Sequence, residues 1–241
     1  MPKGKTKQAN REDKFEKFLL DLIAITEKYK IQLIVTAVVI LILVIGAFVF
    51  TYVKNSNEEK AARIYDIAVL TIQNLSGITN QAERNEYYQN QVNNLNLLIQ
   101  NYPATVGAVR ARLFLGKTMY QTYYFTRNDE ALNLAISYYT GAFDKARSKF
   151  YKSLALLGRA QCYEQKNDMT KAFEDYEMVY QKYRGEGFGA ISLVGMARVK
   201  EMQDDVNTSI QLYKKVVSDF PDSSWVVFAK GKLYFYGVNP Q

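Results

Sequence analysis

The most constraining feature of this chain is an uninterrupted run of 23 uncharged residues from Ile31 to Val53, bounded by Lys30 and Lys54. Nearly all of these residues are aliphatic or aromatic. A helix of this length rises about 34 Å, which exceeds the roughly 30 Å hydrocarbon core of a bilayer. The run therefore predicts a membrane-spanning helix.

Two other structures for this run fit the sequence less well. A helix in the core of a soluble protein is seldom apolar on every side over such a length. A cleavable signal peptide has a shorter apolar region, nearer to the N-terminus, followed by a small-x-small cleavage site. The run here ends instead in Phe48-Val49-Phe50-Thr51-Tyr52. We therefore expect residues 31–53 to remain attached as a signal anchor.

The charges around the run predict its orientation. The thirty residues before it carry eight Lys or Arg, whereas the first twelve after it carry three. Positive residues gather on the cytoplasmic side of membrane spans. We therefore expect residues 1–30 to form a basic cytoplasmic tail and everything from Lys54 onward to lie on the far side of the membrane.

The composition excludes most catalytic chemistry. The chain has no His and a single Cys, Cys162, so Ser-His-Asp and Cys-His nucleophiles, His-ligated zinc and an intramolecular disulfide are unavailable. No metal-binding acidic loop or Gly-rich phosphate loop occurs, and bases are interspersed with acids. We expect no enzyme, no catalytic residues, no cofactor, no metal site, no small-molecule substrate and no nucleic-acid partner. Cys162 is expected to be a small buried apolar residue.

An internal repeat organises the rest of the chain. The segment Leu156-Leu157-Gly158-Arg159-Ala160 recurs 37 residues later as Leu193-Val194-Gly195-Met196-Ala197. A pattern of a small residue, a Tyr and a second small residue occurs three times at the same interval, beginning at Ala135, Ala172 and Ser209. We interpret each repeat as a helix-turn-helix unit whose small residues, above all Ala160 and Ala197, let the two helices approach closely.

Polar segments separate the two parts of each repeat. They are Arg127-Asn128-Asp129, Lys166-Asn167-Asp168 and Gln203-Asp204-Asp205. Asn and Asp in such places favour a turn and then cap the following helix. With these turns as boundaries, we expect helices at 56–77, 82–101, 105–125, 129–146, 149–164, 168–183, 187–201, 206–219 and 223–235.

This pattern resembles the tetratricopeptide repeat family, whose units have about 34 residues and stack into a superhelix. Matching positions include Ala160, Tyr163 and Tyr176 in one repeat and Tyr213 and Pro221 in the next. The longer interval here comes mainly from residues 185–189, which lengthen one loop, so the repeats are degenerate. The expected fold class is all-α, with a single N-terminal transmembrane helix followed by an α-solenoid of degenerate tetratricopeptide repeats.

These features divide the chain into four parts. Residues 1–30 form the basic cytoplasmic tail and residues 31–53 the transmembrane helix. Residues 54–103 form a helical connector and the first helices. Residues 104–241 hold the tetratricopeptide-like repeats and a C-terminal capping helix.

The layout as a whole resembles the YfgM-like family of bacterial inner-membrane proteins. Phe15-Glu16-Lys17-Phe18 and Lys28-Tyr29-Lys30 fit the amphipathic segment that precedes the span in that family. Its members are ancillary partners of the SecY translocon and associate with periplasmic chaperones. The resemblance implies a bacterial inner-membrane protein with a cytoplasmic N-terminus, a periplasmic C-terminal domain and a role in handling newly translocated proteins. The alternative is a structural scaffold subunit of a bacterial envelope machine, such as a secretion apparatus or flagellar motor.

A concave face of such a stack is lined mainly by the first helix of each repeat. Helical spacing from the small positions selects nine residues as candidate contacts for protein partners: Lys117, Tyr120, Gln121, Gln161, Glu164, Gln165, Arg198, Glu201 and Met202. This set is polar and mixed in charge, which suits the recognition of protein segments better than that of lipid or a small apolar ligand.

Overall fold

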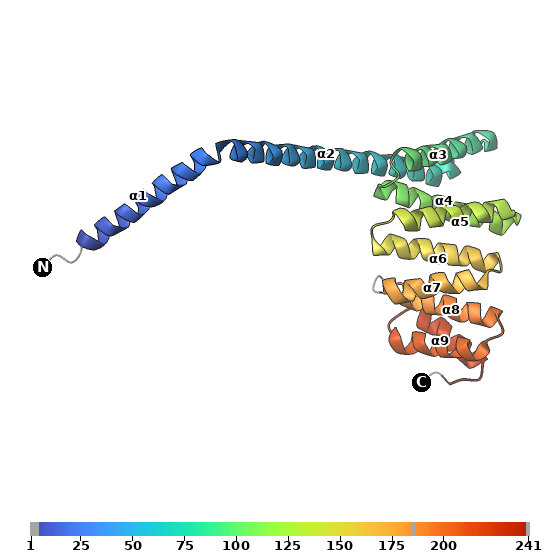
Figure 1. The fold of residues 1–241 in the computed structure, drawn as a ribbon. Helices are drawn as coiled ribbons and strands as arrows, with labels where there is room; N and C mark the ends of the chain where they lie inside the picture. Colours follow the sequence, from blue (N-terminus) through green and yellow to red (C-terminus); the bar gives the residue numbers. More distant parts are fainter. Residues whose placement is uncertain (1–4, 185–186, 240–241) are drawn as a thin grey trace. The chain divides into compact units, whose positions relative to one another are not determined.

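The computed structural model describes residues 5–184 and 187–239, and every regular element in these ranges is a helix (Figure 1). In chain order the elements are α1 (Lys5–Lys28), α2 (Lys30–Asn74), the short 3₁₀ helix η1 (Leu75–Gly77), α3 (Gln81–Asn101), α4 (Val106–Thr126), α5 (Asp129–Lys145), α6 (Lys149–Gln165), α7 (Met169–Tyr183), α8 (Gly189–Met202), α9 (Val206–Asp219) and α10 (Trp225–Phe235). Residues 1–4 of the expected tail, 185–186 of the lengthened loop and 240–241 lie outside the described residues.

The chain divides into two compact units, residues 1–56 and 57–241, and the first unit contains α1. No helix was expected in residues 1–30, whereas α1 covers Lys5–Lys28. This stretch has neither Pro nor Gly, so no residue in it interrupts a helix. The lack of helix-breaking residues therefore favoured a helix here, although the charge pattern alone did not indicate one.

Helix α2 contains the apolar run. The most apolar stretch of 18 consecutive residues in this helix has a mean hydropathy of 3.2, and no side chain from Ile31 to Val53 is buried. The helix is thus long and apolar enough to cross a membrane, and residues 31–53 are not part of the core of this chain. It also continues to Asn74, where separate helices at 31–53 and 56–77 were expected. Residues 54–60 are polar but include no Pro or Gly, so they do not end the helix.

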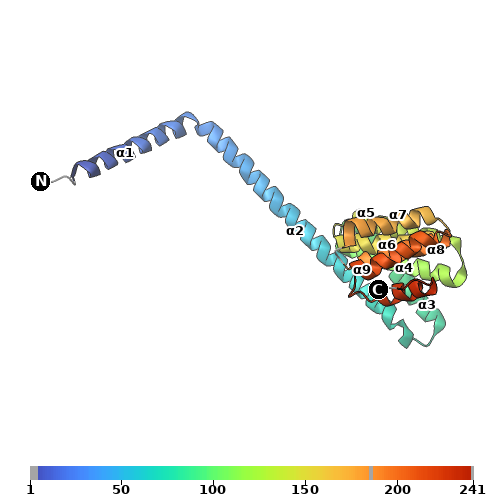
Figure 2. The same cartoon turned by 90° about the horizontal axis from the view of Figure 1, so that it is seen from below.

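In the second unit, successive helices pack side by side in antiparallel order, as Figures 1 and 2 show. The helices form antiparallel pairs, and the first helix of one pair can also contact the first helix of the next. Examples are the contacts of α4 with α6 and of α8 with α10. This is the expected all-α fold of a long apolar N-terminal helix followed by packed helical repeats. Every helix expected beyond residue 80 is present, with ends that differ by at most two residues.

The core of this unit follows the stack from pair to pair. Its largest cluster joins α6 to α10 through fully buried side chains such as Leu156, Tyr176, Leu193, Tyr213 and Leu233. A second cluster joins the end of α2 to α3 and α4. No helix pair could bury its apolar face alone, so the repeats depend on stacking.

The turns inside three successive helix pairs have the same backbone geometry. Arg127, Asn167 and Asp204 each adopt the left-handed conformation, with φ of 54°, 60° and 59°. The following Asn128 accepts a hydrogen bond from the backbone N–H of Glu130 at 2.8 Å and so caps α5. In the same way Asp168 caps α7 and Asp205 caps α9. The polar segments are thus confirmed as turns followed by capped helices.

Glycines allow the helices of neighbouring repeats to meet. The ring of Tyr139 lies directly against Gly158, and the ring of Tyr176 lies against Gly195 in the next repeat. A methyl group added to Gly195 would stand 2.6 Å from Cε1 of Tyr176. The expected alanines of the seam, Ala160 and Ala197, are fully buried two residues further on. The repeated Gly-x-Ala segment thus supplies the surface on which the Tyr of the preceding repeat packs.

We expect Gly195→Ala to destabilise the repeat stack by about 1–2 kcal/mol, because overpacking outweighs the gain in helix propensity. The change is measured as a lower urea midpoint of the full-length protein in detergent. A matched control is Gly231→Ala on α10, where an added methyl group meets nothing within 4 Å. An equal or higher midpoint for Gly195→Ala than for the control would show that the seam tolerates a side chain.

Candidate partner-binding surface

The nine candidate contact residues lie on three first helices, with three residues each on α4, α6 and α8. Side chains from all three helices come together, since Tyr120 lies close enough to Glu164 and Arg198 for their charges to act on its pKa. Burial is the main cause that raises the pKa of Tyr120. The structure therefore brings parts of the predicted set onto one face.

Two members of the set are bound to each other. Arg198 Nε donates to Glu164 Oε2 at 2.8 Å, and Arg198 Nη2 donates to Glu164 Oε1 at 2.7 Å. The same Nη2 donates to the hydroxyl of Tyr176 at 3.0 Å. The Glu164 side chain is only 8% exposed. We name Glu164, Tyr176 and Arg198 the first clamp, because they join α6, α7 and α8 across two repeats.

A related arrangement holds the next pair of repeats. Glu201 accepts a hydrogen bond from Lys232 Nζ at 2.9 Å and another from the hydroxyl of Tyr236 at 2.7 Å. The hydrogen bond to Glu201, together with burial, raises the pKa of Tyr236 to about 12. We name Glu201, Lys232 and Tyr236 the second clamp. In both clamps an acid of one first helix is held by groups one repeat later in the chain.

The clamps divide the predicted set by role. Glu164, Arg198 and Glu201 have partners inside the stack. Among the described residues, no hydrogen bond or ion pair engages the side chains of Lys117, Gln121, Gln161 and Gln165. Exposed members of the set are Lys117, Gln121, Gln165 and Met202, while Tyr120 and Gln161 are half-buried. These six remain the predicted contacts with a partner.

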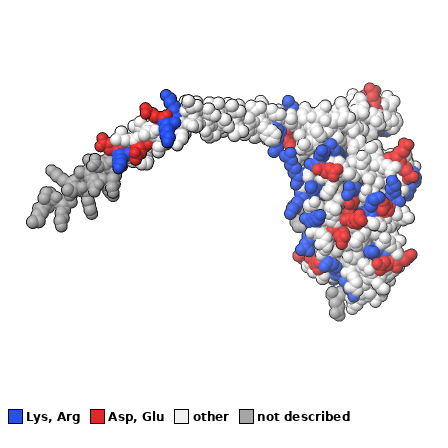
Figure 3. Space-filling model, in the orientation of Figure 1, with Lys and Arg blue, Asp and Glu red and all other residues white. Residues whose placement is uncertain are grey.

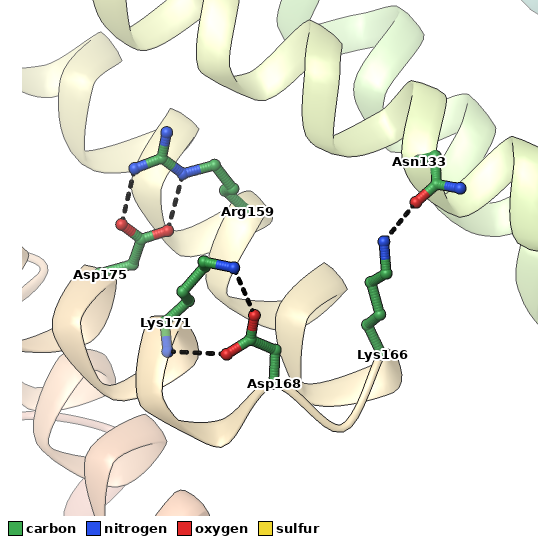
Figure 4. A network of polar contacts seen from close by, with 6 residues as sticks. All are labelled: Asn133, Arg159, Lys166, Asp168, Lys171 and Asp175. Atoms are coloured by element: carbon green, nitrogen blue, oxygen red, sulfur yellow. Dashed lines mark hydrogen bonds and ion pairs between the residues drawn. The ribbon is translucent and has the colours of Figure 1, made fainter.

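A further ion pair lies inside one repeat, on the other side of α6. Arg159 donates to both carboxylate oxygens of Asp175 on α7, at 2.8 and 2.7 Å, and also to the hydroxyl of Thr140 on α5 at 3.1 Å. Figure 4 shows this pair beside the capping carboxylate of Asp168. Arg159 thus links three consecutive helices, a role that the repeat pattern did not reveal.

Two segments of the stack match a known family. A model of the tetratricopeptide repeat matches residues 154–185 and 192–223, which hold most of α6 with α7 and most of α8 with α9. These two segments are tetratricopeptide repeats. No curated protein matches the chain. The preceding pair, α4 with α5, shares the left-handed turn of the two matched repeats, and its Tyr139 packs on a glycine as Tyr176 of the first matched repeat does.

Both ends of the repeat stack expose apolar side chains, which sequence reasoning missed. At the start, Ile67, Leu70 and Leu97 are each more than half exposed beside two open hollows of about 380 and 400 Å³. At the other end, Val227 and Phe235 of α10 are each 79% exposed. The expected capping helix therefore presents an apolar outer face. A detectable signal was the mostly apolar character of 225–236, in which Lys230 and Lys232 are the only charged residues.

Chemically reactive groups are scarce on these surfaces. In the described ranges, no three His, Cys, Asp or Glu residues lie close enough together to hold a metal ion. Cys162 is fully buried against Tyr123, Leu132 and Tyr139, as expected of a small apolar residue. Repeats of this kind serve as protein-binding scaffolds, and the surfaces described here offer polar and apolar contacts of that type.

We expect the thiol of Cys162 to be unreactive in the folded protein. Burial raises its pKa to about 12, so the thiolate that reacts with alkylating agents is scarce at neutral pH. Mass spectrometry after treatment with N-ethylmaleimide should find unmodified protein under native conditions and complete modification in urea. Equal rates of modification in both conditions would contradict the buried position.

Proposed function

We propose that this chain is a membrane-anchored protein-protein interaction module of the bacterial envelope, ancillary to the translocon and its chaperones. The observation that carries the proposal is the direct connection between a helix able to cross a membrane and a stack of tetratricopeptide repeats. Repeats of this type bind protein segments, and an anchor restricts their search to one surface. The resemblance in layout to the YfgM-like family supports the translocon as the partner.

The predicted mode of binding is contact between a protein segment and the polar side chains left free by the clamps. Lys117, Gln121 and Gln165 offer donors and acceptors, and Met202 offers an adaptable apolar group. Such a surface favours weak, reversible association. The anchor compensates for weak intrinsic affinity by raising the effective concentration of the partner.

The proposal includes an N-terminus in the cytoplasm and a repeat domain in the periplasm. We expect a reporter that is active only in the periplasm to be active when fused after Gln241 and inactive when fused before Ile31. The charge bias before the span is the physical reason. The opposite pattern of activity would overturn both the orientation and the proposed localisation.

Site-specific photo-crosslinking in cells tests the proposed function. A photoreactive amino acid is placed at Gln121 or Gln165 on the polar face, with a matched probe at Asn207 on the exposed surface of α9. We expect adducts with the translocon or with periplasmic chaperones from the first two positions, and few from Asn207. Adducts of the same yield and identity from all three positions would contradict a specific polar face.

The exposed apolar ends favour a second candidate function, a scaffold subunit of an envelope machine. Apolar faces at both ends of one stack suit head-to-tail contact between copies or between neighbouring subunits. Probes at Leu70 and Val227 distinguish the two candidates. Adducts with other copies of this chain or with ring components at these positions would support the scaffold, whereas their absence would favour the translocon-associated module.

A further inference from the structure

We propose that one edge of the repeat stack docks on the anionic lipid surface of the membrane that holds the anchor. This inference rests on the proposed anchoring of residues 31–53 in a membrane. The docking surface lies where α5 turns into α6, and we name it the basic edge. It consists of Lys145, Arg147, Lys149, Phe150 and Lys152.

The basic edge has a large local excess of positive charge. Residues 141–155 contain four bases and one acid, Asp144. Lys145, Arg147 and Lys149 are exposed, and among the described residues none of the four bases forms an ion pair. Lys and Arg side chains gather along this side of the stack in Figure 3. Clusters of four or more such bases beside a membrane attract anionic headgroups.

An exposed aromatic residue lies among these bases. Phe150 is 43% exposed, although it follows directly after the first residue of α6. Its ring lies 5.4 Å from the ring of Tyr151 and 5.5 Å from that of Phe188, so it is held in place rather than free to fold inward. Aromatic side chains beside bases are typical of surfaces that enter the headgroup region.

The basic edge lies beside the point where the repeat domain joins its anchor. The carboxylate of Glu58 accepts a hydrogen bond from the backbone N–H of Val106, the first residue of α4, at 2.8 Å. One turn later on α4, Val109 belongs to the same buried cluster as Ala146, which lies within the turn of the basic edge. The start of the repeat domain and the basic edge thus belong to one side of the stack.

In the proposed anchoring, chain connectivity holds residue 57, the start of the second unit, close to the membrane. Residue 57 follows the last apolar residue of the span by four positions, which extend at most about 14 Å. Helix α6 has 17 residues, so the two edges of the stack are about 25 Å apart. The turns at that opposite edge differ in charge, since 127–130 has one base and two acids, 166–168 has one of each, and 203–205 has two acids and no base. The α5–α6 turn, with three bases and no acid in 145–149, is the most basic of these turns.

Fluorescence quenching in nanodiscs tests the docking. The full-length protein, in a Cys162→Ala background, carries a fluorophore at Gln181→Cys on the basic side or at Gln203→Cys at the opposite edge; both positions are exposed. Lipids with a quencher on the headgroup are included in discs of phosphatidylcholine alone or mixed with phosphatidylglycerol. We expect strong quenching of the label at position 181 only in the anionic discs, and weak quenching at position 203 in both.

Charge reversal provides the matched comparison. Arg147→Glu with Lys149→Glu should lower the ratio of docked to undocked domain about tenfold or more in anionic discs. Lys117→Glu with Lys166→Glu reverses the same number of exposed charges away from the basic edge and should leave quenching unchanged. Added salt should act like the first pair of substitutions.

The results separate failure of the docking from failure of the anchor. Equal quenching at both positions, or quenching at position 181 that ignores lipid charge and the Arg147 and Lys149 substitutions, would overturn the docking. Release of the protein from native membranes by alkaline extraction would instead show that residues 31–53 do not anchor the chain. The proposed function would then fail as well, because it depends on that anchor.

Discussion

Gly107→Ala is expected to loosen the junction between the end of α2 and the repeats and to cost about 3 kcal/mol. A methyl group on Gly107 would stand 2.6 Å from the backbone carbon and oxygen of Ala61 and 2.9 Å from its Cβ. Both sides of this contact are backbone, so no side chain can rotate away and the helices must separate. Overpacking a protein core typically costs about 1–3 kcal/mol, and we therefore expect a loss of stability at the upper end of that range.

Hydrogen exchange of the full-length protein in detergent is the suitable measurement, because repeat arrays respond mainly in the neighbouring units. We expect faster exchange in residues 57–74 and 106–115 and unchanged exchange in α8 to α10. The Gly231→Ala control should leave residues 57–74 unaffected and should stabilise its own helix by roughly 0.5–1 kcal/mol. Unchanged protection of residues 57–74 in Gly107→Ala would refute a tight backbone crossing at Ala61.

Removal of Arg198 from the first clamp is the second substitution expected to have a large effect. Arg198→Met leaves the carboxylate of Glu164 nearly buried without its two guanidinium donors. Loss of one partner from a fully buried pair costs about 3–5 kcal/mol. The Arg198 side chain is 37% exposed, so water replaces part of the interaction and we expect about 2–3 kcal/mol.

Three variants separate the clamp from a partner contact. The urea midpoint, followed by fluorescence of Trp225, should fall strongly for Arg198→Met and hardly at all for Lys117→Met on the exposed face. The double variant Glu164→Leu with Arg198→Met should lie close to the wild type, since no charge is then left unpaired. A midpoint for Arg198→Met equal to that of Lys117→Met would show that the clamp contributes little to stability.

This result bears on every binding experiment with the predicted surface. Substitution of Arg198 or Glu201 changes the contacts between repeats, so reduced recovery of a partner would not identify these residues as contacts. Lys117, Gln121 and Gln165 are better probes, because their side chains are exposed and their loss leaves the stack intact.

Much of the architecture was predictable because it depends on local rules. The helix expected at 206–219 was predicted with both ends correct. Its start follows from a capping Asp, and its inward face follows from small and aromatic residues at helical spacing. The same reasoning placed the turns at Asn167 and Asp204, where short polar side chains tolerate the left-handed conformation.

The continuity of α2 illustrates the limit of such rules. Polarity changes sharply after Val53, and this change marked an expected break. A helix ends only where its backbone is interrupted or better satisfied otherwise, and residues 54–60 provide neither Pro, Gly nor a competing turn. The apolar segment therefore ends at Val53, whereas the helix that contains it ends at Asn74.

The sequence by itself determined the apolar helix, the helical repeats and the turns between them, since each depends on residues a few positions apart. Only the tertiary structure decided that Glu164 binds Arg198, that Gly107 meets Ala61 and that Val109 of α4 packs with Ala146 of the basic edge. These partners are distant in the chain. Their meeting depends on how successive helices stack, and no local periodicity records which side chains a stacked neighbour brings within reach.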